Sequence, residues 1–381
     1  MQKFKKILIA NRGEIAIRVM RAANEMGKST VAVFAEEDKL SLHRFKADEA
    51  YKIGQGMGPV AAYLNIQEII QVAKMADADA IHPGYGLLSE KPEFAEACIE
   101  AGLVFIGPSP KTMRQLGNKA TARKMAVKAG VPVIPASDIL PESTDKLEKM
   151  AKDVGLPLML KASWGGGGRG MRLIKSFKDL KKNVLEGKRE AKNAFGNSES
   201  FLEKYIENAR HVEVQILGDK DGNIYHLWER DCSIQRRNQK VIERAPAPYL
   251  TNPQRNEVCK MAKKICQIVG YQCAGTVEFL MDVSNGNFFF IEVNPRIQVE
   301  HTVTEEVTGI DIVRAQIMLA EGSSIKEATG KDNQDEIQCH GHALQCRITT
   351  EDPLNNFIPD YGRITAYRGA TGMGIRLDGG T

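Results

Sequence analysis

The sequence lacks the features that mark secreted, membrane-spanning or thiolate-metal proteins. Its seven cysteines form no CxxC pair, which gives no sign of a disulfide framework or a zinc site. The N-terminal apolar run Ile7–Ala10 is too short for the core of a secretory signal. No apolar stretch approaches the roughly 20 residues that a membrane helix needs. We therefore expect a soluble cytoplasmic protein with no membrane association.

Charge of one sign is also scarce. The 381 residues carry a formal net charge of only +4, with 26% charged residues, as in an ordinary soluble protein. This balance permits small anionic ligands but gives no reason to expect nucleic-acid binding. The chain has no internal repeats or low-complexity tract, and its length predicts two to four subdomains.

The first part of the chain, residues 1–115, alternates strand and helix patterns. Short apolar strands are predicted at Lys6–Ala10, Thr30–Ala35, Ala80–His82 and Val104–Gly107, with helical periodicity between them. This alternation predicts a doubly wound α/β domain with a parallel sheet.

The rest of the chain divides into further units. Residues 116–135 are expected to form a connecting helix, and residues 136–203 a smaller, lysine-rich α+β piece. Strands at His211–Leu217, Thr276–Met281 and Phe288–Asn294 follow, with a helix from about Gln254 to Val269. The polar segment Glu321–Glu336 marks another boundary, after which strands at His342–Thr349 and Gly362–Arg368 begin a further unit.

The stretch Phe288–His301 carries the strongest functional signal. Read as an extended chain, one side of it holds five polar side chains: Glu292, Asn294, Arg296, Gln298 and Glu300. The opposite side is apolar and is expected in the core: Phe289, Ile291, Val293, Ile297 and Val299. Charges on a half-buried strand need partners, and a divalent metal, a polyphosphate and a small anion would supply them. The alternative is an exposed polar face.

A glycine loop provides a second signal. Gly165–Gly170 joins a strand-like segment before it to another after it, so it predicts a hairpin flap that closes over a nucleotide. A flexible connector is the alternative. Lys119 and Lys161 are candidate phosphate ligands, although either alone could be a surface residue.

Two glutamates on apolar strands suggest a metal. Mg²⁺ prefers oxygen ligands, and Glu278, Glu292 and Asn294 could supply three. Salt bridges within a core would explain the same glutamates. The charged segment Glu229–Lys240 is equally compatible with an anion site and with a basic surface patch.

Five sequence blocks together resemble the biotin carboxylase members of the ATP-grasp family. They are IANRGEIAIRVMRA, HPGYGLLSE, KASWGGGGRGMR, ERDCSIQRRNQKVIERAPAP and FIEVNPRIQVEHTVTE. The ending DYGRITAYRGATGMGIRLDGGT is similar to the biotin carboxylase domain of pyruvate carboxylases, and Trp164 and Asn238 point the same way. The resemblance implies an N-terminal biotin carboxylase domain (1–115) and an ATP-grasp domain (116–330) with a central antiparallel sheet and a mobile lid (about 136–203). Residues 331–381 would be the incomplete start of a β-rich C-terminal subdomain.

The resemblance also implies roles for individual residues. Those expected to hold the ATP phosphates are Lys119, Lys161, Gly167 and Gly168. Those expected around the rest of the nucleotide are Glu203, Lys204, Ile206, His211 and Asn238. Mg²⁺ or Mn²⁺ would be held by Glu278, Glu292 and Asn294. Bicarbonate would be bound by Lys240, Arg296, Gln298 and the Val299 backbone, with Glu300 as its base. The biotin side would be formed by Arg347, Tyr85 and Gly86.

The activity implied is the ATP- and bicarbonate-dependent carboxylation of biotin through carboxyphosphate, within a pyruvate carboxylase-like enzyme. The biotin would arrive on a carrier domain outside these residues, since no AMKM-type biotinyl motif is present. A homo-oligomer is expected, with contacts through residues such as Arg18 and Glu90. Three alternatives remain: the biotin carboxylase subunit of an acyl-CoA carboxylase such as acetyl-CoA carboxylase, another ATP-grasp ligase, and a truncated ATP-binding module without turnover.

Overall fold

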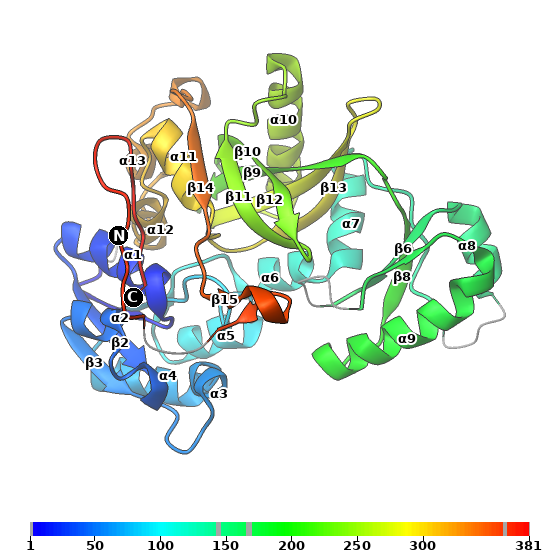
Figure 1. Cartoon of the computed structure of the whole chain (residues 1–381). Coiled ribbons are helices and arrows are strands. Elements are labelled where there is room, and N and C mark those ends of the chain that lie inside the picture. The colour runs from blue at the N-terminus through cyan, green and yellow to red at the C-terminus, as the bar shows by residue number, and fades with distance from the viewer. Residues whose placement is uncertain (1–2, 142–145, 165–169, 361–363, 381) are drawn as a thin grey trace.

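The structure is a computed structural model that describes residues 3–141, 146–164, 170–360 and 364–380. Figure 1 shows an N-terminal α/β region, a central antiparallel sheet, and a smaller lid that projects to one side. The predicted α/β class, with a parallel N-terminal sheet and an antiparallel central sheet, is confirmed. None of the described helices is long and apolar enough to cross a bilayer.

The N-terminal region is built on a five-stranded parallel sheet with the order β3-β2-β1-β4-β5. Its strands are β1 (Lys6–Ile9), β2 (Ser29–Phe34), β3 (Glu49–Lys52), β4 (Ala80–His82) and β5 (Val104–Phe105). Its helices are α1 (Gly13–Glu25), α2 (Leu42–Lys46), α3 (Pro59–Tyr63), α4 (Ile66–Met75), α5 (Pro92–Glu100) and α6 (Pro110–Gly117).

Alternate residues of β1 explain why helices cover both faces of this sheet. Ile7 and Ile9 pack with α1, whereas Leu8 and Ala10 pack in a second core with α4 and α5. A strand that is apolar on both sides must be covered on both sides, as the doubly wound prediction requires.

The lid has its own small hydrophobic core. It contains α8 (Leu147–Val154), β6 (Leu158–Ala162), β7 (Arg172–Ile174), α9 (Phe177–Phe195) and β8 (Ser200–Lys204), with the antiparallel sheet order β7-β6-β8. The glycine loop does connect two antiparallel strands, β6 and β7, as predicted. Gly167 and Gly168 lie outside the described residues.

The two chain segments that join the lid to the body are hydrogen-bonded to each other. The backbone N–H of Ser137 donates to the carbonyl of Leu202 at 2.8 Å, and that of Lys204 donates to Pro135 at 2.8 Å. The entering segment also pairs with the central sheet, where Phe290 N donates to the Pro132 carbonyl at 2.9 Å.

The central sheet is antiparallel, with the order β13-β12-β9-β10-β11-β14. Its strands are β9 (Ala209–Gly218), β10 (Ile224–Arg236), β11 (Gln239–Ala245), β12 (Cys273–Asp282), β13 (Phe288–Asn294) and β14 (Ala343–Cys346). The helices around it are α7 (Lys119–Lys128), α10 (Asn252–Ile268), α11 (His301–Thr308), α12 (Ile312–Ala320) and α13 (Ile325–Thr329). The helix expected over 116–135 is shorter, because Asn118 ends α6 and caps α7 by accepting from Thr121 N at 2.9 Å.

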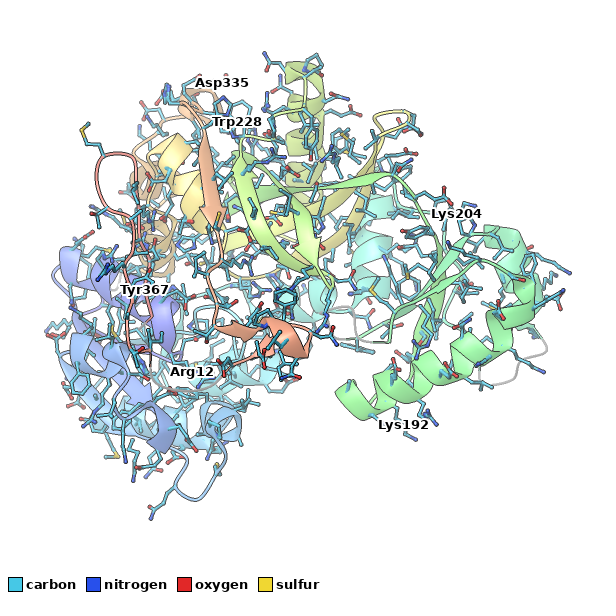
Figure 2. All side chains as sticks on the ribbon, in the orientation of Figure 1. Arg12, Lys192, Lys204, Trp228, Asp335 and Tyr367 are labelled. Atoms are coloured by element: carbon cyan, nitrogen blue, oxygen red, sulfur yellow. The ribbon has the colours of Figure 1, made fainter. Side chains whose placement is uncertain are left out.

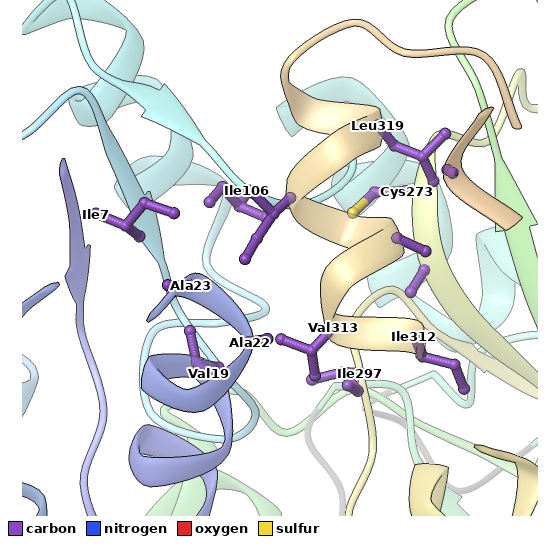
Figure 3. Close-up of a cluster of buried hydrophobic side chains, with 14 of the residues drawn as sticks. Ile7, Val19, Ala22, Ala23, Ile106, Cys273, Ile297, Ile312, Val313 and Leu319 are labelled. Atoms are coloured by element: carbon purple, nitrogen blue, oxygen red, sulfur yellow. The ribbon is translucent and has the colours of Figure 1, made fainter. Parts of the chain in front are cut away.

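One apolar cluster joins the N-terminal region to the central region. Val19 and Ala22 of α1 pack in the same core as Val313 of α12 and Ile297, the residue just after Arg296 (Figure 3). The polar stretch after β13 is therefore anchored to a rigid junction.

The C-terminal stretch returns to the N-terminal region. After β14, the short strands β15 (Glu351–Asp352) and β16 (Ile358–Pro359) pair with each other, and the end of the chain runs beside α1 (Figure 1). Tyr367, labelled in Figure 2, lies on this returning stretch and is 55% exposed. The strand predicted at Gly362–Arg368 is wrong for 364–368, which carry no strand. Its first residues, 362 and 363, lie outside the described part.

Candidate active site

Strand β13 departs from the regular alternation predicted for it. Glu292 faces Glu278 across the sheet while Phe290 faces Phe279, so Ile291 is an extra, bulged residue. The bulge reverses the alternation: Phe288, Phe290 and Val293 enter the core. The expectation that Phe289 and Ile291 form the core face is therefore wrong. Both are half-buried, and Glu292 still projects from the opposite side of the strand.

Lys240 is the electrostatic centre of the site. Its ammonium donates to Glu278 Oε1 at 2.8 Å, to Glu300 Oε1 at 2.7 Å and to Glu213. Burial would lower the pKa of Lys240, but the three carboxylates together hold it well above the usual lysine value. One lysine on β11 thus gathers carboxylates from β9, β12 and the segment after β13.

Arg230 shares the carboxylate of Glu213 with Lys240 and is fully buried. Its Nε donates to Glu213 Oε1 at 2.6 Å, and its two terminal nitrogens donate to Gln215, Thr304, Thr276 and Gln298 at 2.8 to 3.1 Å. All three guanidinium nitrogens therefore have partners, which a buried charge requires.

Glu300 is buried, and the cations around it favour its ionised form. Burial alone would raise its pKa, but attraction by Lys240, Arg230 and Arg347 lowers that pKa below the usual glutamate range. Its Oε2 accepts from Arg347 at 2.8 Å, and Arg347 Nε donates to Glu243 Oε1 at 2.6 Å. The base and the arginine expected at biotin are thus direct neighbours.

Arg296 connects the site to the N-terminal region. Its guanidinium donates to Glu90, to Asn294 Oδ1 at 3.2 Å and to the carbonyl of Ile297 at 3.1 Å. Glu90 follows the loop that holds Tyr85 and Gly86, so the predicted biotin-side loop and the predicted bicarbonate arginine are neighbours.

Gln298 and Val299 complete the anion side. Gln298 donates to Glu278 Oε1 at 3.0 Å, and the carbonyl of Val299 accepts from Gln345 at 3.4 Å. Glu90 and Arg18, expected at a subunit contact, have partners within this chain. Arg18 donates to Glu305 at 2.9 Å and to Asp311 at 2.7 Å.

The proposed metal ligands are side by side, and their oxygens suit a hard divalent cation. Glu278 and Glu292 pair across β12 and β13, and Asn294 donates to Glu278 at 2.8 Å. His211 Nε2 also lies 2.9 Å from Glu278 Oε2. Burial would lower the pKa of His211, but Glu278 raises it. Ligand atoms of His211, Glu213 and Glu278 all lie within 4.8 Å of one another, which adds one imidazole and one carboxylate as neighbours of the predicted set.

A small pocket lies between the lid and the body. Its polar wall contains Lys119, Arg123, Lys161 and Glu203, and its apolar wall contains Phe201, Phe290 and Ile291. Lys119 Nζ lies 3.3 Å from Glu292, while Lys161 donates to Glu203. A lining that combines cations with apolar groups suits a nucleotide.

The remaining predicted nucleotide residues are more scattered. Lys204 donates to the Gly155 carbonyl at 3.2 Å and to that of Leu156, and Ile206 is half-buried just before β9. Asn238 is exposed in the β10–β11 turn, where Arg237 and Asn238 have φ of 53° and 61°. Two consecutive positive φ angles are the geometry of a tight hairpin turn. This geometry favours asparagine, so the turn alone explains the presence of Asn238 at this position.

Comparison with known families agrees with this geometry. The family described as "Biotin carboxylase, N-terminal domain" matches residues 3–113. The family described as "Carbamoyl-phosphate synthase L chain, ATP binding domain" matches residues 118–328, more than half of the chain. The chain belongs to the biotin carboxylase family. The resemblance on which the sequence interpretation rested is confirmed.

Individual biotin carboxylase relatives are similar over the whole chain. Pyruvate carboxylase of Staphylococcus aureus is 53% identical over 381 residues, all of this chain and 33% of that protein. The chain thus spans about a third of the length of the curated relatives it matches. Rhizobium etli pyruvate carboxylase T882A with acetyl coenzyme A has a TM-score of 0.95 and 63% identity, over 100% of this chain and 34% of that one.

This chain matches most of the length of one shorter relative. The biotin carboxylase domain dimer of Hydrogenobacter thermophilus 2-oxoglutarate carboxylase, in complex with MgADP, ADP and bicarbonate, has a TM-score of 0.94 and 47% identity. It covers 99% of this chain and 81% of that one.

Some charged residues of this candidate site were not assigned to it individually from the sequence. They are Glu90, Arg123, Glu213, Arg230 and Glu243. The alternation of polar and apolar residues in β9 could have identified Glu213. This residue lies between two valines that face the core, so its side chain must point to the opposite side of the strand. Arg230 was visible only as part of a charged segment that could equally have been a surface patch.

Proposed function

We propose that the chain catalyses the ATP-dependent carboxylation of biotin, with bicarbonate as the carboxyl source and carboxyphosphate as the intermediate. The observation that carries this proposal is the cluster of Glu300, Lys240 and Arg347, in which a buried, ionised base lies between two cations. A ligase joining a carboxylate to an amine would need the nucleotide cavity but not this second cluster.

We assign Glu300 to take the proton of bicarbonate, because its carboxylate contacts Lys240 and Arg347, two cations that would hold the anion. Arg296 offers a planar guanidinium to the carbonate oxygens. Attack on the terminal phosphate of ATP then yields carboxyphosphate and ADP. The residues that fit a divalent cation are Glu278, Glu292 and Asn294, and such an ion would neutralise charge on the transferring phosphoryl group.

Carboxyphosphate would decompose to CO₂ and phosphate within the closed site, where exclusion of water protects it. Phosphate would take the proton from N1′ of biotin, and that nitrogen would attack CO₂. Arg347 would stabilise the enolate oxygen of the ureido ring, and its contacts with Glu243 and Glu300, which orient the guanidinium, support this role. Tyr85 and Gly86 would line the biotin side.

We further propose that the chain is the biotin carboxylase part of a pyruvate carboxylase-like enzyme, with biotin delivered by a carrier domain. The names of the curated relatives support pyruvate as the final acceptor. A homo-oligomer and a cytoplasmic location remain predictions, and several relatives are named as mitochondrial.

The deciding experiment measures phosphate release and carboxybiotin formation with ATP, Mg²⁺, bicarbonate and free biotin. We expect both products, each requiring bicarbonate. ATP binding by calorimetry without either product would favour the non-catalytic module. Phosphate release that requires an amine and a carboxylate substrate, and not bicarbonate, would favour another ATP-grasp ligase.

A further inference from the structure

Arg123 differs from the other cations of the nucleotide cavity in having no partner. Lys119 is 3.3 Å from Glu292, and Lys161 donates to Glu203. Arg123 lines the same cavity, yet it makes no hydrogen bond or ion pair with any residue that the structure describes. Its donors are therefore available to a ligand without the loss of an existing ion pair.

The surroundings of Arg123 favour the arrival of an anion. Burial lowers the pKa of its guanidinium, and the more distant Glu203 only partly offsets this effect. A partly desolvated guanidinium without a partner is unfavourable, because it has given up water without gaining a protein acceptor. A ligand oxyanion would relieve this cost.

Helix α7 places Arg123 on the same face as Lys119. Asn118 caps α7, and Lys119 and Arg123 follow at positions i and i+4, so both project from one face of the helix. The apolar wall of the cavity, formed by Phe201, Phe290 and Ile291, suits a flat base. Bound along this cavity, a nucleotide would present its phosphates to the cationic wall.

We propose that Arg123 is a nucleotide-binding residue that donates to a phosphate oxyanion of ATP and ADP. Its planar fork can contact two oxygens of one phosphate, which the ammonium groups of Lys119 and Lys161 cannot do. This assignment rests on the proposed use of ATP. It adds a third cation to the two lysines expected from the sequence.

The test compares Arg123→Met with Lys124→Met, which removes the same charge from the exposed neighbour on α7. ATP, ADP and adenosine are titrated into each protein by calorimetry. We expect Arg123→Met to weaken ATP and ADP binding about tenfold, as for loss of one charge-assisted hydrogen bond at a partly exposed site. Adenosine binding should be unchanged, and Lys124→Met should bind all three ligands as the unmodified protein does.

Two further measurements separate the possible outcomes. Thermal melting without nucleotide should show Arg123→Met to be as stable as Lys124→Met, because no hydrogen bond or ion pair with a described residue is removed. A clearly lower melting temperature would indicate a structural role. Arg123→Lys should recover part of the ATP affinity. Equal ATP affinity in Arg123→Met and Lys124→Met would overturn the assignment while leaving ATP use intact. Failure of the unmodified protein to bind ATP would instead overturn the proposed function.

Discussion

Replacement of Glu300 by glutamine separates its catalytic role from its structural one. Glutamine keeps the shape of the side chain but cannot take a proton from bicarbonate. We expect bicarbonate-dependent ATP cleavage to fall by about 10² to 10⁴, the usual contribution of a positioned general base. ATP binding should survive, because the two lysines expected at the ATP phosphates do not depend on Glu300. Lys119 pairs with Glu292, and Lys161 pairs with Glu203.

The structure also limits how much folding stability Glu300→Gln should lose. Without the Glu300 charge, Lys240 still contacts Glu213 and Glu278, and Arg347 still contacts Glu243. No cation is left unpaired, so the loss should be about 1 kcal/mol rather than the roughly 3–5 kcal/mol of a broken buried ion pair.

The pH dependence of this cost has a definite sign. The pKa of Glu300 is lowered in the folded state, so its ionisation stabilises the fold above the unfolded glutamate pKa of about 4.3. That contribution is lost as pH falls through the folded-state pKa. The difference in stability between the unmodified protein and Glu300→Gln should therefore narrow in acid.

The assay is phosphate release with and without bicarbonate, alongside calorimetric ATP titration and thermal melting at neutral and acidic pH. Glu257→Gln, an exposed substitution on α10, is the matched control. Turnover in Glu300→Gln equal to that of the control would refute the role of Glu300 as base. A collapse of its melting temperature at neutral pH would refute the argument about the remaining partners.

Three further substitutions test other parts of the site. Arg347→Ala should uncouple the enzyme, so that bicarbonate-dependent ATP cleavage continues while carboxybiotin is lost; carboxybiotin at the normal rate would argue against the enolate role. Combined Glu278→Ala and Glu292→Ala should abolish the Mg²⁺ dependence of ATP cleavage, and an unchanged Mg²⁺ titration curve would remove the metal site. Arg230→Met should lower the free energy of unfolding by about 1–3 kcal/mol, because the buried oxygens of Gln215 and Gln298 lose their donor while Glu213 keeps Lys240, and equal denaturation midpoints would contradict this.

Local patterns in the sequence predicted much of the fold. The alternation of short apolar strands with helices identified the N-terminal parallel sheet, and Phe288–Asn294 is a strand with the predicted bounds. The glycine loop was correctly read as a hairpin, because strand-like segments flank it on both sides. These features depend on neighbours in sequence, which periodicity can detect.

Contacts between distant segments were beyond the reach of such patterns. Arg296 and Glu90 are 206 residues apart, and neither residue carries a local sign of the other. The bulge at Ile291 depends on the partner strand, so a strict period of two placed Phe289 and Ile291 on the wrong face. Arg123 looked like an ordinary helix residue until the lid and body enclosed a cavity beside it.

The paired connections of the lid would limit the movement that the sequence predicts for it. Because the entering and leaving segments are hydrogen-bonded to each other through Ser137, Leu202, Pro135 and Lys204, they form one two-stranded hinge rather than two independent tethers. A two-stranded ribbon bends more readily than it shears, and the separate core of the lid keeps its elements together. Opening and closing should thus follow a single swinging path, which returns Lys161 and Glu203 to the same position over the cavity in each cycle.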